Sequence, residues 1–420
     1  MSDNKDIILF INEAPASAVE AVRKYAKSLK KPLKIAVIRD NKQAKKDKSD
    51  NVDFLLTCDF SKPSKIVKAL AELSHRFLAV TCRSDKNMDD FASLIPYLPY
   101  LRTPSSESIR WSVDKIAMRQ HFQNYDPKIS PPFTIVHDAS KASIKKIIDK
   151  LRFPLMIKPA GLGASLLVSM CYHKEELEQD LRKAFRKINA MYKHDGRKEE
   201  PKILLEEFME GEMFSVDAYV SSRGTVTFCP FCQVKTGKMI GFDDFFGYEQ
   251  MTPTTLKKNE LDQAEIVAKK AIHAMCLRST SAHVELIKTR DGFKVIELGP
   301  RVGGFRHQLY ELGFGIDHSL NDILTRVPGK LTVAKKTRGH SVAMKFFAQR
   351  EGKLKKVGGI KHIKALKSFV SIKQNKKVGE KCTFAKNGGR SVANLIMFNE
   401  SRSGLLADIR RAEKLLQIIT

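Results

Sequence analysis

The first hundred residues alternate between short apolar segments and segments with helical spacing, and this alternation constrains the fold more than any other feature. The strand-sized apolar segments and the intervening helical segments cover residues 7–11, 16–29, 33–38, 54–57, 63–74 and 77–82. Strands that alternate with helices form a parallel sheet covered by helices. The turn after the first strand, 12–15, lacks the G-x-G-x-x-G pattern of dinucleotide-binding sites. We therefore predict a Rossmann-like α/β layer without a dinucleotide fingerprint.

Length and composition indicate a globular protein of several domains. At roughly 150 residues per domain, 420 residues correspond to two or three domains. No apolar run reaches the roughly 18 residues that a membrane-spanning helix needs, and the N-terminus lacks the layout of a secretory signal. The seven cysteines form no disulfide framework, which is typical of a reducing compartment. We expect a cytoplasmic protein without a membrane partner.

The chain is strongly basic, with 74 Lys and Arg against 47 Asp and Glu and a net charge of +27. Such a charge attracts polyanions, including nucleic acid. The basic residues are nevertheless spread over the chain, without interleaved aromatic residues or a nucleic-acid-binding motif. A solvated lysine-rich surface is therefore the preferred interpretation, and nucleic acid is not expected as a partner.

Residues 281–301 form a predicted β-hairpin around the turn 290–292. Gly at the third turn position suits a three-residue loop. In that register Thr289 faces Phe293, and Glu285 lies directly opposite Glu297. The alternative is an exposed hairpin whose acids are solvated, but the flanking Val, Leu and Ile residues favour a covered sheet.

The hairpin also gathers charge on one face. Because side chains alternate along a strand, His283, Glu285, Glu297 and Arg301 share that face. Two opposed carboxylates repel each other unless a positive charge lies between them. A hard divalent cation such as Mg²⁺ meets this need with oxygen ligands.

Two further motifs precede the hairpin. Lys158 ends a strand before a glycine-rich turn, 159–165, whose backbone N–H groups can hold phosphate oxygens, although it is not a Walker loop. Residues 204–211 form an apolar strand that ends in acids and can pair its backbone with a purine edge. Taken singly, an ordinary hairpin turn and a solvated strand end explain these two motifs equally well.

The order and spacing of the three motifs resemble the ATP-grasp ligases over about residues 110–330. The resemblance implies an α/β ATP-grasp fold with an N-terminal Rossmann-like preATP-grasp domain (1–105), an ATP-grasp domain (106–338, nucleotide-binding lobe about 153–235) and a small C-terminal α+β domain (339–420). The C-terminal region is similar to the branch that includes L-amino-acid ligases and carnosine synthase.

The resemblance also implies a site. Lys115 and Lys158 match the lysines that contact ATP, with Arg119 in the helix of Lys115, and Glu206 would accept from the adenine amino group. The residues implied in ATP binding are Lys115, Lys158, Gly161, Gly163, Ser165, Glu206, Glu207 and Met209.

Further along the chain, Glu285 and Glu297 match the Mg²⁺ carboxylates, with Mn²⁺ as an alternative metal, and Arg301 matches the catalytic arginine. Gly303 and Gly304 open a helix whose N-terminus favours an anion, so we assign them to the substrate carboxylate. His307 is a candidate contact there, and a helix-surface histidine without a role is the alternative.

Three positions depart from the family pattern. Met213 replaces the acid that holds the ribose, Leu167 replaces a glycine, and Gly299 replaces a third metal ligand. Glu212 is a candidate substitute for the missing acid, although its side chain should point to the opposite face. These departures bear on ATP affinity more than on the fold.

We interpret the chain as an ATP-dependent carboxylate–amine ligase that forms an amide through an acyl phosphate, on amino acids or other small carboxylates. The enzyme alternatives are carboxylation and carbamoyl phosphate chemistry. A catalytically weak polyanion-binding protein is the alternative from another class. The oligomeric state is left open, a homodimer included. The glycine-containing segment 236–255 is expected to be a mobile loop that closes over the site.

Overall fold

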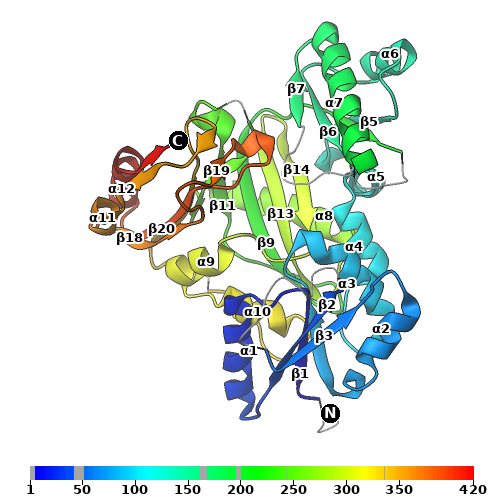
Figure 1. The fold of residues 1–420 in the computed structure, drawn as a ribbon, viewed down its shortest axis with the longest axis vertical. Coiled ribbons are helices and arrows are strands. Elements are labelled where there is room, and N and C mark those ends of the chain that lie inside the picture. The colour runs from blue at the N-terminus through cyan, green and yellow to red at the C-terminus, as the bar shows by residue number, and fades with distance from the viewer. Residues whose placement is uncertain (1–4, 42–51, 161–167, 195–199, 243, 335) are drawn as a thin grey trace.

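The computed structural model describes residues 5–41, 52–160, 168–194, 200–242, 244–334 and 336–420. Figure 1 shows one large central sheet with an N-terminal α/β layer below it, a small lobe above it and a C-terminal part to its left. None of the helices in these ranges is long and apolar enough to cross a membrane.

The N-terminal part is a parallel layer, as the alternation predicts. Its strands pair in the order β3-β2-β1-β4, and β1 in the middle is buried along its whole length. Apolar clusters cover both faces, with α2 and α3 on one face and α1 and the later helix α10 on the other. The elements are β1 (Ile7–Ile11), α1 (Ala16–Leu29), β2 (Lys34–Asp40), β3 (Phe54–Cys58), α2 (Pro63–Leu70), β4 (Phe77–Thr81) and α3 (Met88–Leu94).

The small lobe is an antiparallel sheet in the order β5-β8-β6-β7, with α6 and α7 packed on it. Helices α4 (Ser106–Val113) and α5 (Lys115–Tyr125) lead into it, and the Asp114 side chain caps the first turn of α5. The elements are β5 (Phe133–Val136), α6 (Lys141–Lys150), β6 (Leu155–Pro159), β7 (Ser169–Cys171), α7 (Lys174–His194) and β8 (Ile203–Glu207).

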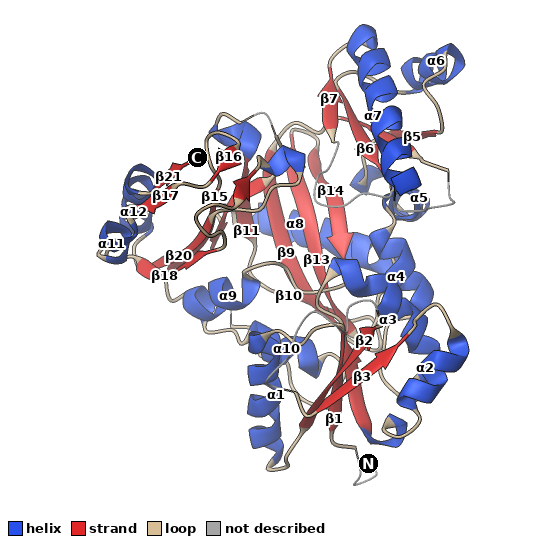
Figure 2. Cartoon of the chain, in the orientation of Figure 1, coloured by secondary structure: helices blue, strands red, loops and turns tan. Residues whose placement is uncertain are grey.

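The central sheet has the strand order β14-β13-β9-β11-β12-β15-β20-β18, with β10 paired to β9 (Figure 2). Helix α8 packs on its apolar face around β9, β13 and β14. The elements up to residue 324 are β9 (Glu212–Val220), β10 (Val226–Phe228), β11 (Cys232–Thr236), β12 (Gly247–Thr252), α8 (Lys258–Ala274), β13 (Thr280–Thr289), β14 (Gly292–Gly299), α9 (Arg306–Phe314) and α10 (His318–Leu324).

The C-terminal part adds three strands to this sheet, so the sheet is continuous across the domain boundary predicted at residue 338. The division into three domains stays a prediction. Helix α12 packs on the added strands with Leu405, Ile409 and Ala412. The elements are β15 (His340–Phe346), β16 (Gly352–Lys353), β17 (Lys356–Gly358), α11 (Ile360–Lys364), β18 (Phe369–Gln374), β19 (Lys381–Cys382), β20 (Ala393–Asn399), α12 (Arg402–Leu415) and β21 (Gln417–Ile419).

The prediction of one mobile loop over 236–255 was wrong for most of that segment. Residues Gly237–Ile240 form a short 3-10 helix, and Gly247–Thr252 form β12, which pairs with β11 and β15 inside the central sheet. The glycine and phenylalanine content suggested a loop, but sheet pairing on both sides of β12 decides its conformation.

Candidate active site

Glu206 at the end of β8 is buried between two cations. Its carboxylate accepts from Arg119 Nε at 2.5 Å and from Lys158 Nζ at 2.5 Å, and its side chain is 1% exposed. Burial raises the pKa of Glu206, but the two cations outweigh this effect and lower its pKa to about 2. Arg119 also donates to the carbonyl of Ile296 on β14 at 2.6 Å, so one guanidinium joins the small lobe to the central sheet.

The structure thus brings Lys158 and Glu206, predicted to contact phosphate and adenine, into direct contact. Beside them, the N–H of Met209 has no hydrogen-bond partner in the described part of the chain, which leaves a donor for the purine edge. The Glu207 carboxylate accepts from the N–H of Arg152 at 3.0 Å. The remaining predicted phosphate contacts and one departure lie outside the described residues; they are Gly161, Gly163, Ser165 and Leu167.

The hairpin places Glu285 opposite Glu297, as predicted. The predicted pairing at the turn was wrong by one residue, because Thr289 pairs with Gly292 rather than with Phe293. A bulge after Glu285 inserts one extra residue into β14 and restores the predicted partner. The shift at the turn and the bulge offset each other, so Glu285 pairs with Glu297 although the predicted pairing at the turn was wrong.

Other charged side chains surround this pair of acids. Lys115 Nζ lies 3.4 Å from Glu297 Oε1, and His283 Nε2 lies 3.5 Å from Glu285 Oε1. Burial raises the pKa of Glu285, but the hydrogen bond from His283 and the nearby charge of Arg301 overcome it and lower the pKa. Glu285 is therefore an ionised acid at neutral pH.

Arg301 forms a two-pronged ion pair with Asp85, a residue that the sequence did not single out. The Nε atom donates to Asp85 Oδ1 at 2.6 Å, and the second nitrogen contacts Oδ2. Asp85 lies in the short 3-10 helix Asp85–Asn87 that follows β4. The N-terminal layer thus supplies an acid to the predicted catalytic arginine.

The centre of the site is Asp217 on β9, which the sequence analysis also missed. Its fully buried carboxylate accepts from His283 Nδ1 at 2.6 Å, His318 Nε2 at 2.8 Å and the N–H of Gly303 at 2.7 Å. Burial opposes ionisation, but the two histidines hold the pKa of Asp217 well below its usual range. A single charged residue in the mostly apolar strand 214–220 is the signal that could have revealed it.

The Asp217 network also fixes the glycine turn before α9. A Cβ atom at Gly303 would lie 2.5 Å from His283 Nδ1, so only glycine fits there, whereas nothing lies within 4 Å of a Cβ at Gly304. Arg306, the first residue of α9, is buried and donates to Gln250 Oε1 and Ser215 Oγ, each at 2.6 Å. His307 lies on the exposed side of α9.

The donor set fits a magnesium ion together with a nucleotide. Glu285 and Glu297 offer carboxylate oxygens from facing strand positions, and Mg²⁺ typically takes one or two protein carboxylates and completes its shell with phosphate and water oxygens. Within the described ranges, no group of three or more His, Cys, Asp or Glu is arranged to hold a metal. Met213 stands where the family has an acid, and its neighbour Glu212 was the candidate substitute. The Glu212 carboxylate accepts a hydrogen bond from Gln233 Nε2 at 3.2 Å.

Solved structures of similar fold cover the whole chain. The L-amino acid ligase from Bacillus licheniformis superposes with a TM-score of 0.82 and 18% identity, covering 100% of this chain and 99% of that one. Phosphoribosylglycinamide synthetase from Anaerococcus prevotii superposes with a TM-score of 0.67 and 19% identity, covering 99% of both chains. These likenesses establish the fold.

Sequence relatives align over shorter stretches. An uncharacterized protein of Sinorhizobium fredii, y4rH, is 23% identical over 278 residues, which are 64% of this chain and 53% of that protein. A D-alanine–D-alanine ligase of Staphylococcus saprophyticus is 35% identical over 78 residues, 18% of this chain and 22% of that enzyme. The chain thus spans about half of the first relative and about a fifth of the second. Residues 151–308 match the family model of the ATP-grasp domain. The chain therefore contains an ATP-grasp domain and has the ATP-grasp fold, as the motifs predicted.

Proposed function

We propose that this protein is an ATP-dependent carboxylate–amine ligase that acts on small molecules. The observation that carries the proposal is the facing pair Glu285 and Glu297, with the cations Lys115 and Arg301 beside it. Opposed acids surrounded by cations suit a metal–nucleotide complex, because phosphoryl transfer needs charge compensation and positioning more than covalent chemistry from the protein.

ATP would lie between the small lobe and the central sheet. Lys115 and Lys158 would contact its phosphates, and Met209 N–H and Glu206 would contact adenine. Glu285 and Glu297 would hold Mg²⁺, which when bound supplies charge neutralisation on the phosphates. The Lys158 ammonium has three N–H donors, so it could contact phosphate while it still donates to Glu206, which also keeps Arg119 as a partner.

The substrate carboxylate would lie at the glycine turn. The backbone amides that follow Gly303 are at the N-terminus of α9. Arg301 lies two residues before Gly303 in the chain, and its guanidinium donates to the carbonyl of Val302. A carboxylate oxygen would attack the γ-phosphorus of ATP, and ADP would leave with the bond electrons. An amine nitrogen would then attack the acyl carbon, lose a proton and expel phosphate, forming the amide. Arg301 would stabilise the negative charge on the transferred group.

The test is ADP formation in a panel of amino acids supplied singly and in pairs, with the amide product identified by mass spectrometry. We expect ADP only when a carboxylate and an amine are both present. Glu297→Gln should reduce turnover on the order of a hundredfold or more, while exposed Glu72→Gln should not change it. Equal turnover in Glu297→Gln and the unchanged protein, or no ADP with any pair, overturns the proposal.

A cytoplasmic location and small-molecule partners complete the proposal. All seven cysteines are unpaired thiols, six of them buried, which supports a reducing compartment.

A further inference from the structure

A cavity of about 610 Å³ lies on the C-terminal part of the central sheet. Its floor is formed by β15, β18 and β20, and its rim by Phe246 and the turn 388–391. The residues that line it are Phe246, Lys345, Phe347, Lys373, Gln374, Asn375, Ala385, Gly388, Gly389, Arg390, Ser391 and Asn394. We call it the C-terminal cavity.

Lys345 and Lys373 occupy neighbouring cross-strand positions on the floor of the cavity. Asn394 on β20 pairs with Lys345 on β15 and with Lys373 on β18. Paired residues of neighbouring strands point to the same face, and the strands are about 4.8 Å apart, so the two lysines start about 10 Å apart with an amide between them. Arg390 adds a third cation from the turn.

No acid among the described residues of the cavity lining neutralises these cations. None of the described residues that line the cavity is Asp or Glu, and in the described part of the chain Lys345, Lys373 and Arg390 form no ion pair. The polar groups beside them are amides and a hydroxyl, which are neutral. Asn375 donates to Ser391 Oγ at 3.1 Å, and Ser391 donates to Asn394 Oδ1 at 2.7 Å. Three like charges around one hollow repel each other, and an anion placed among them relieves this repulsion.

Lys345 connects the C-terminal cavity to the candidate active site. Its Nζ atom lies 4.3 Å from the ring centre of Phe246 and 5.8 Å from that of Phe305, the residue directly after the Gly303–Gly304 turn. Burial lowers the pKa of Lys345 to about 8, the charge of Glu285 partly offsets this effect, and Arg306 adds to it. Lys345 thus lines the C-terminal cavity and also lies beside the residue that follows the glycine turn.

We propose that the C-terminal cavity binds a second anionic group of the substrate, a carboxylate or a phosphate, remote from the carboxylate that is activated. The proposal rests on the ligase function above and narrows its substrate class to acidic small molecules. Lys373 and Arg390 are the specificity residues, because they are exposed at the cavity and lie outside the site for ATP and metal.

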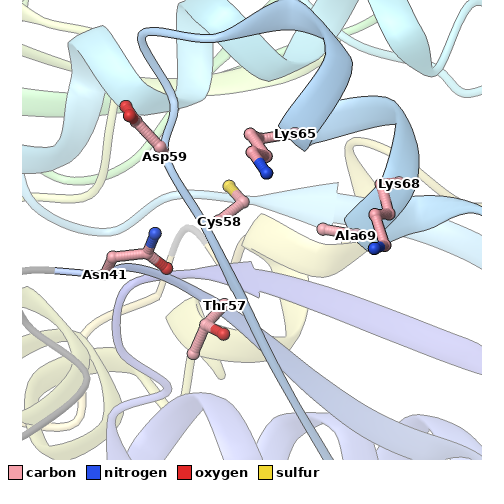
Figure 3. A pocket seen from close by; sticks show the side chains of 7 residues that line it. All are labelled: Asn41, Thr57, Cys58, Asp59, Lys65, Lys68 and Ala69. Atoms are coloured by element: carbon pink, nitrogen blue, oxygen red, sulfur yellow. The ribbon is translucent and has the colours of Figure 1, made fainter.

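A smaller cavity in the N-terminal layer provides a matched control. This hollow of about 300 Å³ lies at the ends of β2 and β3. Figure 3 shows Lys65 beside Cys58, with Asp59 and Lys68 on opposite sides of them. The double variant Lys65→Gln/Lys68→Gln removes the same charge as Lys373→Gln/Arg390→Gln. It leaves the C-terminal cavity unchanged.

The first experiment compares acidic substrates with neutral substrates of the same shape. We expect glutamate or O-phosphoserine to be used with a higher kcat/KM than glutamine or serine. The Lys373→Gln/Arg390→Gln variant should reduce this preference at least about tenfold, as expected for the loss of charge-assisted hydrogen bonds. A larger response to O-phosphoserine identifies phosphate, and one to glutamate identifies carboxylate. An unchanged preference, or the same loss in the Lys65→Gln/Lys68→Gln control, overturns the proposal.

The second experiment needs no turnover, so it separates this proposal from the ligase function. Calorimetry measures glutarate and its neutral diamide, glutaramide, binding to the full chain. We expect glutarate to bind more tightly, and its Kd to rise about tenfold or more in Lys373→Gln/Arg390→Gln alone. Equal binding of the two probes, or equal Kd values in all variants, overturns the cavity assignment even if ATP-dependent ligation is found. Normal glutarate binding without any ADP formation supports the cavity and rejects the ligase.

Discussion

Glu206 and Asp217 are both buried carboxylates with depressed pKa values, but their partners differ in freedom. Asp217 is held by two histidine rings and a backbone amide, and His318 among them is only 1% exposed. Glu206 shares its charge between buried Arg119 and Lys158, whose side chain reaches solvent and is 14% exposed. A carboxylate whose partners are all buried holds the scaffold together. A carboxylate with a partner that reaches solvent can share that partner with a ligand.

The strongest test of this contrast is Asp217→Ala. The change leaves His283, His318 and the N–H of Gly303 without their acceptor in a buried place, so we expect the free energy of unfolding to fall by roughly 3–5 kcal/mol. Urea unfolding followed by circular dichroism measures it. Asp262→Asn, which removes an exposed pair with Lys258, should cost less than about 1 kcal/mol. Similar losses in both variants would contradict the scaffold role.

Lys158→Met should affect binding rather than stability. Arg119 continues to pair with Glu206 in this variant, so the fold keeps its buried ion pair. The lost charge-assisted hydrogen bond to phosphate should raise the Kd of a non-hydrolysable ATP analogue roughly ten- to a hundredfold. Calorimetry provides the measurement, with exposed Lys150→Met as the control. An unchanged Kd would show that Lys158 does not contact the phosphates of the bound nucleotide.

The two neighbouring glycines give a smaller, matched comparison. A methyl group at Gly303 would collide with His283 and Asp217, whose positions the network fixes, so Gly303→Ala should lower the free energy of unfolding by roughly 1–3 kcal/mol. Gly304→Ala enters open space and should change it by less than about 0.5 kcal/mol. If both variants unfold at the same urea concentration as the unchanged protein, the turn is not held by Asp217.

The final comparison is the pH dependence that Glu206 contributes. Its pKa falls from the ordinary 4.5 to about 2 on folding, so its ionised form stabilises the folded protein above pH 4.5, and this contribution is lost as the pH falls towards 2. The difference in unfolding free energy between the unchanged protein and Glu206→Gln should therefore shrink over that interval. A difference that stays constant with pH would show that the two cations do not act on this acid.

The features that could be predicted from the sequence are those that depend on the periodicity of neighbouring residues. The strand–helix alternation of the first hundred residues became a parallel layer. The pairing of Glu285 with Glu297 was also predicted, but only because the error at the turn and the bulge in β14 offset each other. The bulge in β14 was not predicted, because neither strand shows in its sequence which residue will be left unpaired.

Contacts between distant segments could not be predicted in the same way. Arg119 and Glu206 are 87 residues apart, and Arg301 and Asp85 are 216 apart, so no spacing rule connects them. Strand β12 was taken for a loop because its pairing with β15 depends on residues about ninety positions later.

The Asp217 network also has a consequence for the order in which the chain can fold. Its acid is synthesised 101 residues before His318, the partner on the opposite side of the carboxylate. His283 and Gly303, its other two partners, follow the acid by 66 and 86 residues, so His318 is the last of the three to be made. The buried carboxylate can therefore gain its full set of partners only once α10 has been synthesised, which makes α10 the segment that completes the centre of the sheet.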